Sequence, residues 1–306
     1  MEKQQKLYND KYIKIKKIGG GSFGMVYIVE EKDSKKQFAM KKFYMDNLNN
    51  GGAEKQFSLL TQFDHRNIVK VIEEFKQNGN QYLITEYFSN NLYNFSKKPT
   101  QEKDVKQIIK QLLQALSYLH SQNYVHRDVK PDNILLSSLG EIKLTDFDLC
   151  RKVVSGTNPE EKMSRNAVTL YYRPPEIFFG DRNYGVKVDV WGAGCVFIEL
   201  ILGEPVFKAN NELGVLGKII ETLGCPSEDN WPGVSNLPNY LPYQGATYQL
   251  DKILSGKISE KGLKIIEKMM KLDPSQRESA ENLLKEAYFN EEISSEEELA
   301  KNLGLI

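Results

Sequence analysis

Residues 126–133 have the sequence His126-Arg127-Asp128-Val129-Lys130-Pro131-Asp132-Asn133. An aspartate such as Asp128 can orient an attacking hydroxyl group and accept its proton. Five residues further on, Asn133 can hold a metal ion through its side-chain oxygen. Because polar residue types at these fixed spacings rarely occur together by chance, this stretch predicts a catalytic loop and decides the fold.

A glycine-rich run lies near the start of the chain, with the sequence Gly19-Gly20-Gly21-Ser22-Phe23-Gly24-Met25-Val26. Bare backbone can approach phosphate groups and donate N–H hydrogen bonds to them. Since residues 26–29 continue the run as a strand and not as a helix, we expect a hairpin that could fold over a nucleotide. Taken alone, the run would fit an ordinary glycine-rich turn equally well. The next strand, 38–41, places Lys41 on the opposite side from its apolar neighbours.

Two parts of the chain differ in the periodicity of their apolar residues. The first part has strand-like segments and one helical segment near 53–62; the strands are expected at 12–15, 26–29, 38–40, 69–72 and 82–84. The second part begins with an apolar helical stripe over 100–121, which starts at a Thr100 cap. Further helices are expected at 188–202, 212–223, 260–272 and 280–285.

These patterns predict an α+β fold with two lobes. The N-terminal lobe, at about 12–86, is small and mainly β with one helix. A short hinge at about 86–91 lacks the composition of a free linker and leads into a larger, mainly α C-terminal lobe at about 92–289. Residues 290–306 form a C-terminal tail.

Composition narrows the possible partners and location. Lys plus Arg and Asp plus Glu each total 41, so no field of one sign favours nucleic acid or an anionic membrane as a partner. The three cysteines, Cys150, Cys195 and Cys225, are widely spaced, which fits packing residues in a reducing compartment. The apolar run 188–202 is shorter than the roughly 20 residues of a spanning helix. With no secretory pattern in residues 1–11, we expect a cytoplasmic or nuclear protein.

Together these motifs resemble those of eukaryotic protein kinases, over about residues 12–289. Two further stretches are similar to segments of the cyclin-dependent kinase-like (CMGC) group. They are Ala167-Val168-Thr169-Leu170-Tyr171-Tyr172-Arg173-Pro174-Pro175-Glu176, which resembles the end of the activation loop, and Glu221-Thr222-Leu223-Gly224-Cys225-Pro226 with Trp231-Pro232-Gly233-Val234, which resembles the insert of that group. The resemblance implies that residues 1–306 form a bilobal protein kinase domain.

The resemblance implies a serine/threonine protein kinase that uses ATP and Mg²⁺. In such an enzyme Asp128 would be the catalytic base. Lys130 would neutralise charge on the transferring phosphoryl group, as it does in Ser/Thr-specific members. Lys41 would hold the α- and β-phosphates, while Asp146 and Asn133 would each bind a Mg²⁺ ion.

The resemblance also implies a set of residues around the nucleotide. Glycines would cover the phosphates, apolar side chains would sandwich adenine, and polar groups would bind its edges; the set is Ile18, Gly19, Gly21, Gly24, Val26, Ala39, Thr85, Glu86, Phe88, Asn91 and Leu135. The backbone of Glu86 and Phe88 would pair with the edge of the base, and Thr85 would stand at the back of the pocket. The apolar members could equally be ordinary core residues.

Regulation is implied at two places. Ser164 occupies the position of the activation-loop phosphosite, where Arg127 and Arg151 could pair with its phosphate. Ser22 and Phe23 stand where cyclin-dependent kinases often carry an inhibitory Thr and Tyr, so inhibition through a tyrosine is excluded there.

Other residues match elements of specificity and architecture. Val168 and Arg173 resemble the elements that favour proline after the phosphorylated residue. Asp189 resembles the buried anchor of the catalytic loop, and Glu176 with Arg277 resembles the buried ion pair of the family.

Two positions depart from the family pattern. Gln56 stands where a glutamate partner of Lys41 is expected, and an amide binds the lysine more weakly than a carboxylate. Asp148 replaces the glycine that follows Asp146-Phe147, so we expect a stiffer hinge and an added negative charge near the metal site.

These departures leave open a second hypothesis, a pseudokinase or weakly active nucleotide-binding interaction module of the same fold. For the active form the expected partners are protein substrates. A cyclin-like regulatory subunit stays open as a partner, because residues 49–56 lack the usual cyclin-contacting sequence of the family.

Overall fold

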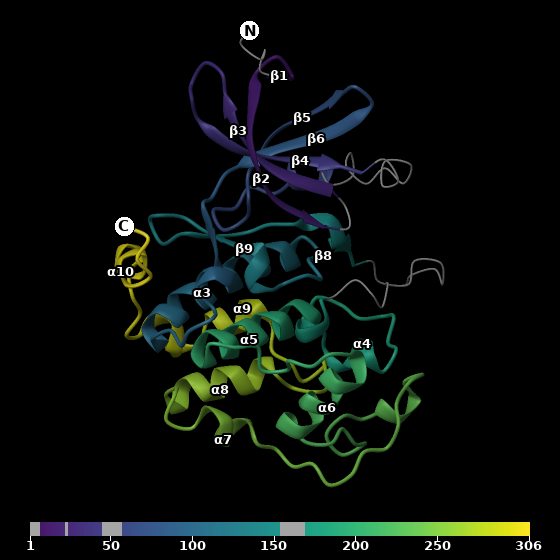
Figure 1. Ribbon diagram of the computed structural model, residues 1–306. Helices are drawn as coiled ribbons and strands as arrows, with labels where there is room; N and C mark the ends of the chain where they lie inside the picture. Colours follow the sequence, from purple (N-terminus) through teal and green to yellow (C-terminus); the bar gives the residue numbers. More distant parts are fainter. Residues whose placement is uncertain (1–6, 22–23, 45–56, 154–168) are drawn as a thin grey trace. The chain divides into compact units, whose positions relative to one another are not determined.

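The computed structural model describes residues 7–21, 24–44, 57–153 and 169–306. The chain divides into two units, Met1–Ser89 and Asn90–Ile306 (Figure 1). The described part of the first unit is built on a β-sheet, and the described part of the second is mainly helical. The predicted α+β, bilobal fold class is therefore confirmed.

The first unit contains an antiparallel sheet of six strands among its described residues, in the order β1-β2-β3-β4-β6-β5. The strands are β1 (Leu7–Tyr8), β2 (Tyr12–Gly21), β3 (Gly24–Glu31), β4 (Gln37–Phe43), β5 (Val71–Gln77) and β6 (Asn80–Glu86). In β4 the side chains of Phe38 and Met40 are buried while Ala39 and Lys41 are only partly covered, which is the alternation of a half-buried strand. The predicted strands at 12–15, 26–29, 38–40 and 82–84 are confirmed.

The predicted strand at 69–72 was misplaced. The observed strand begins at Val71, because the Lys70 N–H donates to the Glu86 side-chain carboxylate (2.7 Å) and not to a backbone carbonyl of β6, although the Lys70 carbonyl still accepts from the Glu86 N–H (3.1 Å). Val69 is buried without being part of the strand. In the helix expected near 53–62, residues 57–60 are helical, and 53–56 lie outside the described residues.

The second unit holds most of the helices. They are α3 (Glu102–Ser121), α4 (Pro175–Phe178), α5 (Lys187–Leu202), α6 (Glu212–Leu223), α7 (Leu250–Leu254), α8 (Glu260–Met269), α9 (Ala280–Leu284) and α10 (Glu296–Asn302). Short strands are β7 (Asn90–Asn91), β8 (Tyr124–Val125), β9 (Ile134–Leu136), β10 (Ile142–Leu144) and β11 (Arg151–Lys152). Short 3₁₀ helices are η1 (Leu92–Asn94), η2 (Pro131–Asn133), η3 (Phe147–Leu149), η6 (Leu170–Tyr172), η7 (Val234–Asn236) and η8 (Ala287–Asn290).

Helices α3 and α5 pack against each other in the core of the second unit (Figure 1). The predicted apolar stripe of α3 is fully buried, and nearly every residue of α5 is buried, as expected for a central helix. Among the residues that the structure describes, no helix is long and apolar enough to cross a membrane. Cys150 and Cys195 are buried, as predicted for packing residues, whereas Cys225 is half-buried.

Two predicted helix ends were wrong. Helix α3 begins after Gln101 and not after a Thr100 cap, because the first carbonyl to accept helical N–H groups is that of Gln101, from Asp104 and Val105 (both 3.0 Å). Helix α8 ends at Met269 and not at residue 272: Met270 is its C-cap, and beyond it the Lys271 carbonyl accepts from the Arg277 guanidinium (3.2 and 3.1 Å).

A buried ion pair joins α4 to the segment before α9. Arg277 donates two hydrogen bonds to Glu176, at 2.8 and 3.0 Å, and both side chains are almost fully excluded from solvent. The guanidinium also donates to the Lys187 carbonyl (2.9 Å) and lies 5.0 Å from the centre of the Trp191 ring. The predicted pair is confirmed, and its satisfied hydrogen bonds make the buried charges tolerable.

The C-terminal residues pack on α3 instead of extending away from it. Asp104 of α3 accepts hydrogen bonds from Ser294 (2.6 Å) and from the side-chain amide of Asn302 (3.0 Å). Helix α10 begins with a capping box formed by Ser295 and Glu298. These contacts fix residues 294–302 against α3 (Figure 1).

Removing one member of the buried pair should destabilise the second unit strongly. We expect Glu176→Ala to lower the free energy of unfolding by about 3–5 kcal/mol, because Arg277 would keep a buried, unpaired charge. Urea unfolding followed by circular dichroism measures this change. Glu281→Ala is the matched control, since Glu281 pairs with Lys285 in an exposed position, and it should leave stability unchanged. Equal effects of the two substitutions would contradict the prediction.

Candidate active site

The catalytic loop predicted at 126–133 runs from β8 into η2. The buried carboxylate of Asp189 in α5 accepts the backbone N–H groups of His126 and Arg127, both at 2.8 Å. His120 lies 2.9 Å from the same carboxylate. These bonds hold Arg127 in a left-handed conformation, with φ of 71°, which is uncommon for a non-glycine residue. The predicted anchoring role of Asp189 is confirmed.

Three polar side chains meet at Asp128. Its carboxylate accepts hydrogen bonds from Lys130 (2.7 Å), from the Asn133 amide (2.8 Å) and from the Thr169 hydroxyl (2.6 Å). The Lys130 ammonium also donates to the Thr169 hydroxyl, at 2.8 Å. Asp128 is only 6% exposed, so these contacts hold a nearly desolvated carboxylate in one orientation. Such a group can accept a proton from a hydroxyl group brought next to it.

Thr169 was missed as a site residue in the sequence. It lies in the stretch that resembles the end of the activation loop, and its backbone is extended immediately before η6. Its hydroxyl contacts both Asp128 and Lys130. A single threonine has no charge and belongs to no spacing pattern that marks it as a site residue. Only the family resemblance of the whole stretch could have pointed to Thr169.

His126 connects the catalytic loop to the segment around Asp146. Its Nε2 lies 3.0 Å from the Thr145 carbonyl, and its Nδ1 accepts the N–H of Asp128 at 3.2 Å. The imidazole ring also meets the Phe147 ring edge-on, with centroids 4.8 Å apart. The histidine therefore fixes the catalytic loop to the segment that follows β10.

The two predicted metal ligands emerge at the same end of the β9–β10 hairpin. Strand β9 begins directly after Asn133, and β10 ends two residues before Asp146, with Leu144 opposite Ile134. The N–H of Thr145 donates to the Asn133 carbonyl at 3.0 Å. A carboxylate and an amide oxygen are hard ligands that suit Mg²⁺ when phosphate oxygens complete the coordination. The donor set thus fits the implied metal.

Asp146 and Asp148 have different backbone conformations. Asp146 is left-handed, with φ of 62° and ψ of 69°, and it precedes η3. Asp148 lies inside that right-handed 3₁₀ helix, where its backbone needs no positive φ. The glycine of the family pattern is therefore not required at position 148 in this conformation. A stiffer hinge at Asp148 stays a prediction.

Residues implied for the nucleotide gather on one face of the sheet in the first unit. Val26 lies opposite Gly19 of β2 and opposite Lys41 of β4, and Ala39 lies opposite Thr85 of β6. Directly opposed residues share a face, and Ala39 and Lys41 are two residues apart on one strand. The five residues therefore line the same side of the sheet.

The described residues of the glycine-rich run, 19–21 and 24–26, pair at the end of β2 and the start of β3, as the predicted hairpin requires. Gly24 is required by packing, because a side chain there would lie 2.2 Å from the Lys42 carbonyl oxygen. A side chain at Gly19 or Gly21 would meet nothing within 4 Å, and neither residue has a positive φ. Since packing and backbone strain do not demand glycine at these two positions, the open space fits a group that must approach the bare backbone.

Other implied nucleotide residues lie at the chain segment that joins the units. In β6, the N–H of Glu86 donates to the Lys70 carbonyl (3.1 Å) and the Glu86 carbonyl accepts from the Thr85 hydroxyl (3.3 Å), so pairing of Glu86 with a base stays a prediction; Ile18 of β2 is exposed. In the second unit, Asn91 lies opposite Leu135 on β9. The side-chain oxygen of Asn91 is buried without a hydrogen-bond partner, so it fits a donor from a ligand.

The implied site residues come from both units. Lys41, Ile18 and Phe88 belong to the first unit, and Asp128, Asn133 and Asp146 belong to the second. The convergence of Lys41 on Asn133 and Asp146 stays a prediction.

The two arginines implied in regulation lie in the second unit. The Arg127 guanidinium donates to the Leu149 carbonyl (2.6 Å) and to the Tyr184 hydroxyl (3.3 Å). Burial lowers the pKa of Arg151, and the positive charge of Arg127 lowers it further. Two positive charges that act on each other in this way can both be stabilised by a bound anion such as a phosphate. The regulatory residues predicted at Ser164, Ser22 and Gln56 lie outside the described residues, as does Val168.

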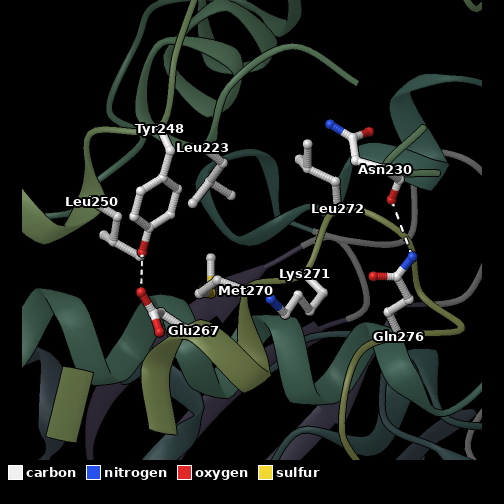
Figure 2. Close-up of a pocket in the computed structure, with 9 residues that line it drawn as sticks. All are labelled: Leu223, Asn230, Tyr248, Leu250, Glu267, Met270, Lys271, Leu272 and Gln276. Carbon is white, nitrogen blue, oxygen red and sulfur yellow. Dashed lines mark hydrogen bonds between the residues drawn. The ribbon is translucent and has the colours of Figure 1, made fainter. Parts of the chain in front are cut away.

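A separate pocket of about 350 Å³ lies elsewhere in the second unit (Figure 2). Its walls come from the end of α6, the irregular insert, and the end of α8; they are Leu223, Asn230, Tyr248, Leu250, Glu267, Met270, Lys271, Leu272 and Gln276. Tyr248 donates to Glu267 (2.9 Å) and Gln276 donates to the Asn230 carbonyl (3.2 Å), which ties the insert to α8 and the following loop. The pocket shares no residue with the Asp128 cluster.

Comparison with known proteins agrees with this geometry. The chain matches the protein kinase domain family over residues 12–289. It belongs to the protein kinase family. The kinase domain is 34% identical to cyclin-dependent kinase C-2 and to cyclin-dependent kinase C-1 of Oryza sativa subsp. japonica, over 92% of this chain. It spans about three fifths of those relatives, 59% and 58% of their lengths. The resemblance to cyclin-dependent kinases is thus confirmed.

The anchor of the catalytic loop should make stability depend on acidic pH. Burial favours the neutral form of Asp189, but the hydrogen bond and charge of His120, together with His126, hold its pKa below the ordinary value of 3.8. Below that value the unfolded chain binds the proton first, so the contribution of Asp189 is present near neutral pH and is lost on acidification. We expect the difference in unfolding free energy between wild type and Asp189→Asn to shrink from about pH 6 to about pH 3.

Urea titrations at each pH measure this difference. Asp229→Asn is the control, because Asp229 is exposed. Curves for wild type and Asp189→Asn that stay parallel over the whole range would contradict the assignment.

Proposed function

We propose that this kinase domain is an active serine/threonine kinase that transfers the γ-phosphoryl group of ATP to hydroxyl groups of protein substrates, preferring a proline after the acceptor. The observation that carries the proposal is the buried Asp128 carboxylate, oriented by Lys130, Asn133 and Thr169. The new bond joins the substrate hydroxyl oxygen to the γ-phosphorus, and the bond from that phosphorus to the β–γ bridging oxygen breaks. The hydroxyl proton passes to Asp128.

The other residues of the chain hold and neutralise the reactants in this proposal. Lys130, 2.7 Å from Asp128, places a positive charge beside the carboxylate that would receive the proton. Asn133 and Asp146 would hold Mg²⁺, which neutralises charge on the phosphates when bound. Lys41 and the open backbone of Gly19 and Gly21 would hold the phosphates themselves.

Substrate and partner assignments extend the proposal. Lys130 supports Ser/Thr specificity, and Arg173 supports the preference for proline. The relatives are named cyclin-dependent kinases, so a cyclin-like subunit is the regulatory partner to test by pull-down, while protein substrates are the primary partners. We propose a cytoplasmic or nuclear location for the kinase.

Removing the base should abolish phosphoryl transfer. We expect Asp128→Asn to lower the rate of labelled phosphate transfer from ATP to a Ser-Pro peptide by at least about 10²-fold, because the amide cannot accept the proton. Asp132→Asn is the matched control: it makes the same change four residues away, at an exposed side chain, and should keep activity. Transfer that persists unchanged in Asp128→Asn would defeat the proposal, and an inactive wild type would favour the pseudokinase hypothesis.

Metal binding provides a second prediction that needs no turnover. We expect ATP to raise the melting temperature of the wild type more with Mg²⁺ than without it, since a ligand of the folded state stabilises it. Asp146→Asn should weaken the Mg²⁺-dependent part of the affinity by at least about tenfold, because one anionic ligand is lost. A titration followed by differential scanning fluorimetry measures the effect, with Asp132→Asn as control. An unchanged Mg²⁺ response in Asp146→Asn would remove Asp146 from the metal site.

A further inference from the structure

Residues 169–173, here called the closing segment, begin at the catalytic cluster. Thr169 donates to Asp128 at 2.6 Å and so fixes the start of the segment beside the base. Farther along, the Tyr172 hydroxyl donates to the buried Glu199 carboxylate of α5 at 2.7 Å. The closing segment is therefore attached to the catalytic loop and to the central helix.

The end of the closing segment is attached to α6. The Arg173 guanidinium donates through Nη1 to the Glu212 carboxylate at 2.5 Å, and it lies 5.3 Å from the centre of the Phe178 ring. The side chain of Arg173 is 9% exposed, whereas that of Glu212 is 62% exposed. An exposed acid thus fixes a nearly buried cation, and the charge-assisted bond sets the direction of the guanidinium.

Helix α6 presents Glu212 in a fixed position. Glu212 is the first residue of the helix, directly after the N-cap Asn211, whose side chain accepts the Gly214 N–H at 2.8 Å. This cap orders the first turn, and a negative charge there is favourable at the positive end of the helix dipole. The ordered first turn therefore fixes the backbone from which the Glu212 side chain reaches Arg173.

We propose that Glu212 is a positioning residue for substrate selection: it fixes Arg173, and through it the closing segment that flanks the acceptor hydroxyl. The inference rests on the proposed kinase function and deepens it. Arg173 is the fourth residue after Thr169, so its backbone lies at most about 14 Å along the chain from a residue that contacts the base. Glu212 itself contacts neither the base nor Lys130, so it acts on the peptide next to the acceptor and not on the chemical step.

The same helix offers a matched control. Glu221 lies in the last turn of α6, its side chain is 65% exposed, and it pairs with Lys218 at 2.8 Å. Its removal also costs an exposed ion pair on α6, but that pair does not involve the closing segment. Any difference between Glu212→Gln and Glu221→Gln therefore reports on Arg173.

Steady-state kinetics with a Ser-Pro peptide and its Ser-Ala counterpart test the inference. We expect Glu212→Gln to lower the ratio of kcat/KM values, Ser-Pro over Ser-Ala, by about three- to fivefold, the range of a weak ion pair. The change should come from a higher KM for the Ser-Pro peptide, with kcat and the KM for ATP within about twofold of wild type. Glu212→Asp should restore part of the ratio, and Glu221→Gln should match the wild type.

A ratio in Glu212→Gln equal to that of Glu221→Gln would overturn the inference while leaving the proposed function intact. If the wild type transfers no phosphate, the proposed function fails. The inference about Glu212 is then tested by measuring the binding of a fluorescent Ser-Pro peptide, which needs no turnover. Weaker binding to Glu212→Gln than to Glu221→Gln would then support it, and equal binding would overturn it. Melting temperatures of all variants exclude unfolding as the cause of any loss.

Discussion

The conformation of the 126–133 loop depends on one buried carboxylate, Asp189. A charge without solvent is costly unless donors surround it, and here two backbone N–H groups and His120 supply them. The two N–H groups belong to His126 and Arg127 of the loop itself. The same hydrogen bonds therefore stabilise the buried charge and hold the loop in place. The left-handed Arg127 persists because both its neighbours and its own N–H are fixed.

Hydrogen-bond donors also surround the Asp128 carboxylate, but here they come from side chains and not from the backbone. The carboxylate is nearly desolvated, and an uncompensated charge there would be unfavourable; Lys130 neutralises it while Asn133 and Thr169 set its direction. Electrostatic contacts in such a shielded place are stronger than at the surface. The cluster is therefore both stable and oriented before any substrate arrives, which is the arrangement that general base catalysis needs.

The periodicity of apolar residues predicted helices and strands well. It could not predict features that depend on contacts between residues far apart in the chain. The apolar period of α3 and the alternation in β4 follow from burial of one face, so both were visible in the sequence. The exact start of α3 was not, because moving it by one residue leaves the apolar period unchanged; Thr100 instead donates its N–H to the Leu200 carbonyl, a hundred residues away in the chain. Asp104 is another case: its partners Ser294 and Asn302 come from the C-terminal segment, and no periodicity announces them. The Glu176–Arg277 pair could be expected only through the family resemblance.

The backbone conformation explains how Asp148 can replace the glycine of the family pattern. In this conformation Asp146 carries the left-handed backbone and Asp148 the right-handed one. Aspartate tolerates the left-handed region better than most residues, so the first of these is affordable without glycine. A rearrangement that demanded a positive φ at position 148 would cost Asp148 up to about 1–2 kcal/mol that glycine would not lose. We therefore expect Asp148 to disfavour arrangements with a positive φ at that position, and so to hold the loop in the observed arrangement, in which Asp146 follows the β9–β10 hairpin beside Asn133.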